Sequence, residues 1–259
     1  MEIDNILPDV ISWARQAGAI QMTYFRTDRL NTRAKLNDSD IVTAADAACE
    51  AFITAAIRDR FPDHSIISEE SGATIVEGSD WEWVIDPLDG TTNFASGLPL
   101  FGISIALRHK GVTELGVVFA PYLDELFHAV RGEGAMLNGR PVGCRREKKL
   151  ERCVVATGFP VDKATNADNN LDNVGRVLPR VRGLRRLGSA AIDLCYVAAG
   201  FLDGYWELNL HEWDVAAGEL IISEAGGRTV RFRPDTEERH VCLLAAQPEV
   251  FDELLTLVK

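Results

Sequence analysis

The sequence contains no apolar run that approaches the roughly 20 residues needed to cross a bilayer, so no membrane span is expected. Its first residues, MEIDNILPDVISWARQ, carry acids and lack an uninterrupted apolar stretch, which argues against a signal peptide. Cysteine is scarce and unpatterned, with five residues and no C-x-x-C pair. This argues against a zinc site or a disulfide framework and favours reduced thiols in a cytoplasmic protein.

The sequence also has fewer basic than acidic residues. Lysine and arginine total 27 against 39 aspartates and glutamates, which gives a formal net charge of −12. Nonspecific nucleic-acid binding needs a cationic surface that displaces counterions from phosphates, so direct binding to nucleic acid is not expected. The excess of acids is compatible with a site that gathers carboxylates around metal ions.

Several common nucleotide and metal motifs are missing. No G-x-x-x-x-G-K-[ST] phosphate loop occurs, and Gly132-Glu-Gly134 lacks the rest of a dinucleotide-binding pattern. The polar stretch 162–173 lacks the central glycine and the terminal glutamate of a calcium loop. We interpret it as a polar loop.

The composition is that of a globular protein: 259 residues, 46% hydrophobic and 25% charged. Periodicity predicts helices at 4–26, 43–60, 189–199 and 214–224, one ending near 178 and one beginning near 248. Strands are predicted at 65–68, 81–85, 100–108, 114–119, 125–130, 153–157, 183–187, 203–207 and 241–245. The alternation predicts α/β layers with sheets covered on both faces. We expect one domain over 1–259, with a soft internal boundary near the charged residues 145–151.

Two acids follow an apolar strand in W-V-I-D-P-L-D-G-T-T-N, residues 83–93. Pro87 cannot donate to a sheet ladder, so we expect the strand to end at Asp86. Asp89 and Gly90 then form a turn on which the two carboxylates converge, and a cation between them offsets their repulsion. The backbone N–H groups from Gly90 onward are suited to an anion-binding nest, and metals beside a nest suit phosphate-ester chemistry.

Three other segments place acids at the ends of expected elements, and each is ordinary by itself. Glu69 follows the strand at 65–68 in what reads as a surface turn. Asp214 is most simply a helix N-cap, and Asp46 complements a helix dipole from the first turn. A bare D-x-x-D-G is likewise most simply a turn. The combination of the four segments is what points to a function.

Together the segments resemble the inositol monophosphatase family, part of the lithium-sensitive, metal-dependent phosphatases that include fructose-1,6-bisphosphatase. The shared motifs span roughly residues 35–227: Asp40 to Asp46, S-E-E-S at 68–71, W-V-I-D-P-L-D-G-T-T-N-F at 83–94, G-S-A-A at 188–191, and Trp213 to Gly227. T-G-F-P at 157–160 and R-L-G-S-A-A-I-D-L at 186–194 are similar to the bacterial branch.

The resemblance implies a layered αβαβα sandwich and a site for two or three Mg²⁺ ions. One ion would be bound by Glu69, Asp86 and the backbone carbonyl of Leu88. A second would be bound by Asp86, Asp89 and Asp214, so that Asp86 bridges the two. A third, weaker ion would be held by Glu69 mainly through waters.

The same resemblance assigns the substrate contacts. Gly90 and Thr91 would bind phosphate through backbone N–H groups, and three residues would contact the inositol ring: Asp89, Ala190 and Glu207. Glu69 and Thr91 would orient a metal-activated water that attacks phosphorus, with Asp46 hydrogen-bonded to Thr91. Homodimer formation is also implied.

The implied activity is hydrolysis of myo-inositol-1-phosphate, because Glu207 matches the family's ligand for an inositol hydroxyl. Such sites often have relaxed specificity, which leaves four alternative substrates open: fructose-1,6-bisphosphate, histidinol phosphate, phosphoadenosine phosphate and NADP. A different alternative is a regulatory protein associated with the transcription machinery, since bacterial relatives in this family also act in that way.

A phosphatase with an aspartate nucleophile is the nearest competing chemistry. The signature of such enzymes is D-x-D-G-T, and the part after its first aspartate matches Leu88 to Thr91. The position of the nucleophile is occupied by Pro87, which excludes that mechanism.

Overall fold

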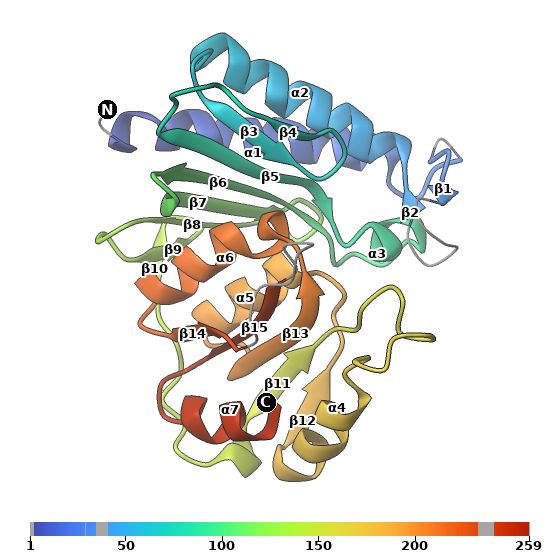
Figure 1. Cartoon of the computed structure of the whole chain (residues 1–259), viewed down its shortest axis with the longest axis vertical. Coiled ribbons are helices and arrows are strands. Elements are labelled where there is room, and N and C mark those ends of the chain that lie inside the picture. Colours follow the sequence, from blue (N-terminus) through green and yellow to red (C-terminus); the bar gives the residue numbers. More distant parts are fainter. Residues whose placement is uncertain (1–2, 29, 35–40, 233–240, 259) are drawn as a thin grey trace.

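The computed structural model describes residues 3–28, 30–34, 41–232 and 241–258. Helices and sheets alternate in Figure 1: a helical layer, a large sheet, a second helical layer, a smaller sheet and an outer helical layer. The fold is therefore the layered αβαβα arrangement that the family resemblance implies.

The first layer consists of α1 (Leu7–Tyr24) and α2 (Ala44–Arg60), preceded by the short helix η1 (Ile3–Asn5) and the strand pair β1 (Arg33–Ala34) and β2 (Ile41–Val42). Thr43 caps α2: its hydroxyl accepts a hydrogen bond from the Ala45 N–H, and its own N–H donates to Asp46. This capping box fixes the start of α2. Buried apolar side chains from both helices pack against one face of the large sheet.

The large sheet has eight strands in the order β10-β9-β8-β7-β6-β5-β3-β4. The bounds of its strands are β3 (Ser65–Ser68), β4 (Gly72–Thr74), β5 (Trp81–Asp89), β6 (Gly102–His109), β7 (Val112–Ala120), β8 (Glu125–Val130), β9 (Ala135–Leu137) and β10 (Arg140–Val142). Only the β3–β5 pair is parallel among these neighbours, so these two strands end at the same edge. The segments after Ser68 and Ile85 therefore lie side by side.

The third layer is formed by α5 (Ala190–Ala198) and α6 (Glu212–Glu224), between the two sheets. Both helices contribute to an apolar cluster that also contains residues from each sheet. Gly226 follows α6 with a φ of 77°, and the Gly227 N–H bonds the Ile222 carbonyl, so the two glycines end the helix as expected.

The smaller sheet has five strands in the order β12-β11-β13-β15-β14. Their bounds are β11 (Val154–Thr157), β12 (Gly183–Arg185), β13 (Gly204–Leu210), β14 (Arg228–Arg231) and β15 (Val241–Ala246). Helices α4 (Leu171–Val177) and α7 (Phe251–Val258) cover its outer face with a third apolar cluster. Two short helices complete the chain: η2 (Leu150–Arg152) and η3 (Leu178–Arg180).

Several details differ from the sequence-based expectation. Strand β5 does not end at Asp86 but continues to Asp89, because a register shift between these residues carries the strand past Pro87. The turn after Gly90 is a short helix, α3 (Thr91–Ala95). The short strands β4 and β14 were not predicted, since each lies at a sheet edge and lacks a long apolar run.

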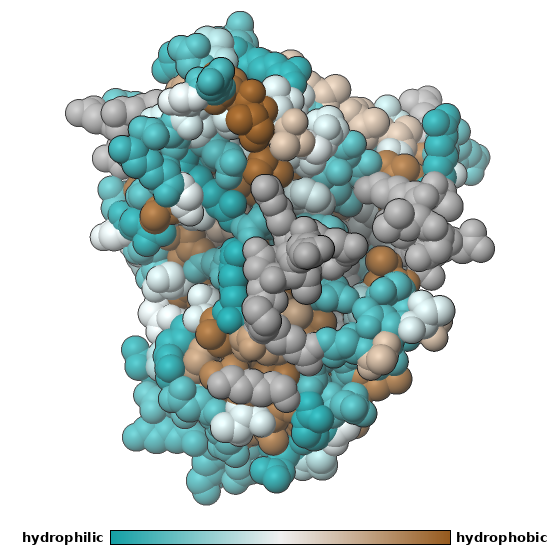
Figure 2. Space-filling model, viewed as in Figure 1, coloured by the Kyte–Doolittle hydropathy of each residue, from teal (hydrophilic) through white to brown (hydrophobic). Residues whose placement is uncertain are grey.

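Hydrophilic residues cover most of the face shown in Figure 2, where hydrophobic residues form separate small groups. Among the described residues, no helix combines the length and the apolar character that a bilayer crossing requires.

Candidate metal and phosphate site

Three carboxylates converge at the end of β5. Oxygen atoms of Asp86, Asp89 and Asp214 all lie within 4.8 Å of one another. Asp86 and Asp89 are buried and Asp214 is partly buried. In the described part of the chain, this is the one group of three potential metal-ligating side chains gathered so closely.

The register shift in β5 sets the first two acids. The Leu88 N–H donates to the Asp86 carboxylate at 2.9 Å, which closes a local turn around Pro87. Pro87 cannot donate to the ladder, but its carbonyl accepts from the buried side chain of Gln21 at 2.8 Å. Helix α1 thus supports the irregular end of the strand from behind.

The first turn of α5 holds Asp89. The Ser189 hydroxyl donates to its carboxylate at 2.5 Å, and the N–H groups of Ala190 and Ala191 donate at 3.2 and 2.7 Å. The start of a helix leaves such N–H groups without partners inside the helix, and a carboxylate satisfies them. Ser189 also caps α5 by accepting from the Ile192 N–H, a role that the serine before an alanine-rich helix signals in the sequence.

Asp214 reaches the site from the first turn of α6. The helix begins at Glu212, two residues earlier than predicted, so Asp214 is its third residue instead of its cap. The His211 N–H donates to the Asp214 carboxylate at 2.6 Å. Trp213 stacks on His211 with ring centroids 4.6 Å apart.

Burial and mutual repulsion make this cluster unfavourable when it is fully ionised. Burial, followed by the charges of Glu69, Asp89 and Asp214, raises the pKa of Asp86 well above its usual range. Burial raises the pKa of Asp89 to about 6, although Ser189 and Ala191 oppose the shift. A divalent cation would reverse these shifts by stabilising the charged carboxylates. Oxygen ligands of this kind fit Mg²⁺.

Glu69, which follows β3, lies outside the group of three. Its N–H bonds the Ile85 carbonyl at 3.3 Å, so the parallel β3–β5 pair places it beside Asp86. Its charge is near enough to raise the pKa of Asp86, Asp89 and Asp214. The charge distribution around the cluster therefore includes this fourth acid.

Thr91 links the cluster to α2. Its hydroxyl lies 3.2 Å from the Asp46 carboxylate and 3.0 Å from the Leu88 carbonyl, two acceptors within reach of its single proton. The other oxygen of Asp46 accepts from the Thr43 hydroxyl at 2.6 Å. Burial is the main cause that raises the pKa of Asp46 to about 6.

Gly90 is required where β5 meets α3. Its φ is 90°, and a Cβ there would lie 2.9 Å from the Leu100 carbonyl and 3.2 Å from the Gly188 carbonyl. No other residue type fits this conformation and this space without strain. The N–H groups of Thr91 and Thr92 follow directly, in the first turn of α3.

Glu207 on β13 lies at the α5 side of the site. Its carboxylate accepts from the Tyr205 hydroxyl at 2.6 Å, and burial raises its pKa to about 7. The charge of Arg186 partly opposes that shift. Asp193 on α5 is buried and its pKa is raised well above the usual range by burial and by the charge of Glu207. Sequence reasoning gave no role to Ser189, Arg186 or Asp193, although all three fall inside the motif at 186–194.

Asp40 of the first motif lies outside the described residues. The remaining motifs converge in a layered α/β protein with a buried acidic centre beside a glycine turn, an arrangement typical of metal-dependent phosphatases. Comparison with known proteins identifies the family within this class: the model of the inositol monophosphatase family matches residues 2–258 of the chain. The chain belongs to this family.

Individual relatives agree with that assignment. The chain is 46% identical to the Nus factor SuhB of Pasteurella multocida, over 99% of this chain and 97% of that protein. The suhB extragenic suppressor protein of Bartonella henselae is 36% identical, with a TM-score of 0.91 over 98% of each chain. The inositol monophosphatase of Anabaena is also 36% identical, with a TM-score of 0.88 over 99% of this chain and 96% of that one.

Proposed function

We propose that this protein is a Mg²⁺-dependent phosphomonoesterase that hydrolyses myo-inositol-1-phosphate or a similar small polyol phosphate. The observation that carries the proposal is the convergence of Asp86, Asp89 and Asp214 within 4.8 Å. Two or three Mg²⁺ ions bound there, with Glu69 and the Leu88 carbonyl completing the ligand set, would neutralise phosphate charge and lower the pKa of the attacking water.

The chain's own residues supply the rest of the chemistry. The N–H groups of Gly90 and Thr91 would hold the phosphate. The Thr91 hydroxyl is oriented by its hydrogen bond to Asp46. It would accept a hydrogen bond from the attacking water, take up a proton from that water and release its own proton toward Asp46. Glu69 would orient the same water. No covalent phosphoenzyme is needed.

The polyol would lie against Asp89, the Ala190 backbone and Glu207. The Ala190 N–H donates to the Asp89 carboxylate at 3.2 Å, and a hydroxyl oxygen of the substrate would replace that carboxylate as its acceptor. The ionised Glu207 carboxylate is a hydrogen-bond acceptor, so a hydroxyl of the substrate can donate to it. The Anabaena relative, whose name is inositol monophosphatase, supports this substrate.

The test is phosphate release from myo-inositol-1-phosphate with Mg²⁺, with EDTA and during a lithium titration. We expect release that requires Mg²⁺ and that lithium inhibits. The same assay on fructose-1,6-bisphosphate, histidinol phosphate, phosphoadenosine phosphate and NADP ranks the substrates by kcat/KM. A strong preference for one of these four would overturn the inositol assignment and retain the chemistry.

A regulatory role is the second candidate, supported by the Pasteurella relative, which is named a Nus factor. It is compatible with catalysis, because the acids of the site are all in place in this chain. Affinity purification with wild type and with the Asp86→Asn variant separates the two functions. Recovery of transcription proteins by both, together with no phosphatase activity on the whole panel, would place the regulatory role first. We also propose that the protein is cytoplasmic and forms a homodimer. Sedimentation analysis tests the dimer.

A further inference from the structure

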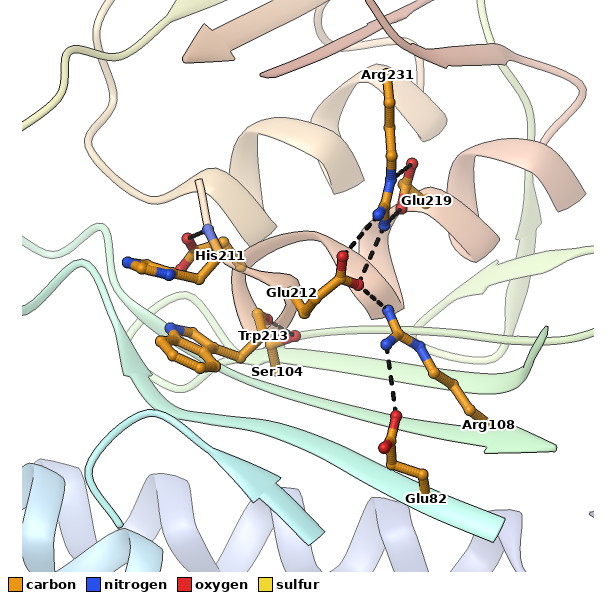
Figure 3. Close-up of polar contacts among 9 residues, drawn as sticks. Glu82, Ser104, Arg108, His211, Glu212, Trp213, Glu219 and Arg231 are labelled. Atoms are coloured by element: carbon orange, nitrogen blue, oxygen red, sulfur yellow. Dashed lines mark hydrogen bonds and ion pairs between the residues drawn. The ribbon is translucent and has the colours of Figure 1, made fainter. Parts of the chain in front are cut away.

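Glu212, the first residue of α6, lies at the centre of a network of ion pairs that joins four elements. Figure 3 shows the network running from Arg231 and Glu219 through Glu212 to Arg108 and Glu82. Arg231 on β14 bonds the Glu212 carboxylate at 2.6 and 3.2 Å. Arg108 on β6 donates to the same carboxylate and lies 3.6 Å from Glu82 on β5.

The network differs from an ordinary surface ion pair. Isolated pairs in water contribute little because solvent screens them. Here the side chain of Arg108 is only 11% exposed and that of Glu212 only 23% exposed. Arg231 also bonds Glu219 at 2.8 Å, so one guanidinium holds two acids on the same helix. Several charges in fixed positions then act together.

A second contact fixes the same helical turn. The Ser104 hydroxyl on β6 donates to the carbonyl of Trp213 at 3.3 Å. Ser104 is paired with Asp86 across the β5–β6 ladder, and Arg108 is paired with Glu82 in the same ladder. Strand β6, which pairs with β5 at Asp86, therefore contacts both Glu212 and Trp213, the two residues before Asp214.

We infer that Arg108 and Arg231 act through Glu212 as positioning residues for Asp214. The first turn of α6 is tied to the large sheet by Arg108 and to the small sheet by Arg231, so both sheets determine where the Asp214 carboxylate lies relative to Asp86. The inference rests on the proposed function, because it assumes that Asp214 is a metal ligand. Residues behind a ligand commonly contribute about 10-fold to 100-fold in metal affinity.

The experiment is a calorimetric titration of the purified protein with Mg²⁺, comparing wild type with Glu212→Gln and Arg231→Met. Glu212→Gln keeps the size of the side chain and removes its charge. Arg228→Met is the matched control, because Arg228 lies on the same strand but pairs with Asp252 on α7. We expect the Kd for Mg²⁺ to rise about 10-fold in both network variants and to change less than about 2-fold in the control.

Catalysis gives the second readout. Saturating Mg²⁺ should restore kcat in both network variants, since the defect is in metal binding and the phosphate contacts are unchanged. A melting temperature that falls while the Kd stays within 2-fold of wild type would show a merely structural network and overturn the inference. Wild type that binds no Mg²⁺ would overturn the proposed function together with the inference, so the two failures are distinguishable.

Discussion

The carboxylate of Glu207 occupies the space that a side chain at position 158 would fill. A Cβ on Gly158 would lie 2.0 Å from the carboxylate carbon and both of its oxygens. The position of Glu207 therefore depends on a glycine in the loop after β11, and it is set by the contact between two distant segments.

Gly158→Ala should displace Glu207 and weaken binding of a polyol. A hydrogen bond to a charged group contributes about 1.5–3 kcal/mol, so kcat/KM for myo-inositol-1-phosphate should fall about 10-fold or more. Phenyl phosphate, which has no hydroxyl for Glu207, should be hydrolysed nearly as well as by wild type. Gly175→Ala is the control, because nothing lies within 4 Å of a Cβ there. Equal losses on both substrates would contradict a role for Glu207 in recognising the polyol.

Asp86→Asn and Asp214→Asn should each abolish turnover while the fold remains intact. Each change removes a negative charge from the three-carboxylate cluster and leaves a side chain of the same size. Because the supporting residues behind a ligand already contribute about 10-fold to 100-fold, loss of a ligand itself should lower kcat/KM by more than about 100-fold. Circular dichroism checks folding. Near wild-type activity in either variant would refute the metal assignment.

Thr91→Val should lower kcat by about 100-fold, in line with the usual contribution of a positioned proton-transfer group. Valine keeps the branched shape but removes the hydroxyl that contacts Asp46. Thr91→Ser keeps the hydroxyl and should retain most of the activity. If valine and serine variants turn over at the same rate, the hydroxyl has no part in the reaction.

The metal-free protein should lose stability as the pH rises. The folded-state pKa values of Asp46 and Asp89 are raised to about 6 and that of Glu207 to about 7, above the ordinary 3.8 and 4.5. At pH values between the ordinary and the raised pKa, the folded protein thus binds more protons than the unfolded chain. The stabilisation that comes from these bound protons is lost as the pH rises through 6 to 7. Urea unfolding in EDTA should give a larger free energy at pH 5.5 than at pH 8.

Mg²⁺ should reverse that trend, because it binds the ionised carboxylates of the folded state. At pH 8, saturating Mg²⁺ should therefore raise the unfolding free energy of wild type far more than that of Asp214→Asn. Metal-free protein that is equally stable at both pH values would show that the acids of the cluster do not titrate in this range.

Much of the site can be identified from the sequence because its parts are local. The turn from Asp86 to Thr91 carries two acids, a proline and a glycine within a few residues, and each has a definite effect on the backbone. Thr43 and Asp46 form the capping box that begins α2, with the usual spacing of such a box. The predicted start of α6 was less accurate, because the N-cap of the helix is His211 and not Asp214.

The sequence by itself predicted the alternating helices and strands and the turn that carries Asp86 and Asp89, because periodicity and turn residues act over short distances. The αβαβα arrangement and the set of candidate metal ligands were implied by the resemblance to a known family. The resemblance implied which acids meet, and the tertiary structure supplies the physical reason. Asp214 joins Asp86 and Asp89 because α6 packs between the two sheets. Ser189 reaches Asp89 because the start of α5 lies beside the end of β5. The network around Glu212 also had no signature in the sequence, since pairing between Arg108 and Arg231 through one carboxylate depends on elements that only folding brings together.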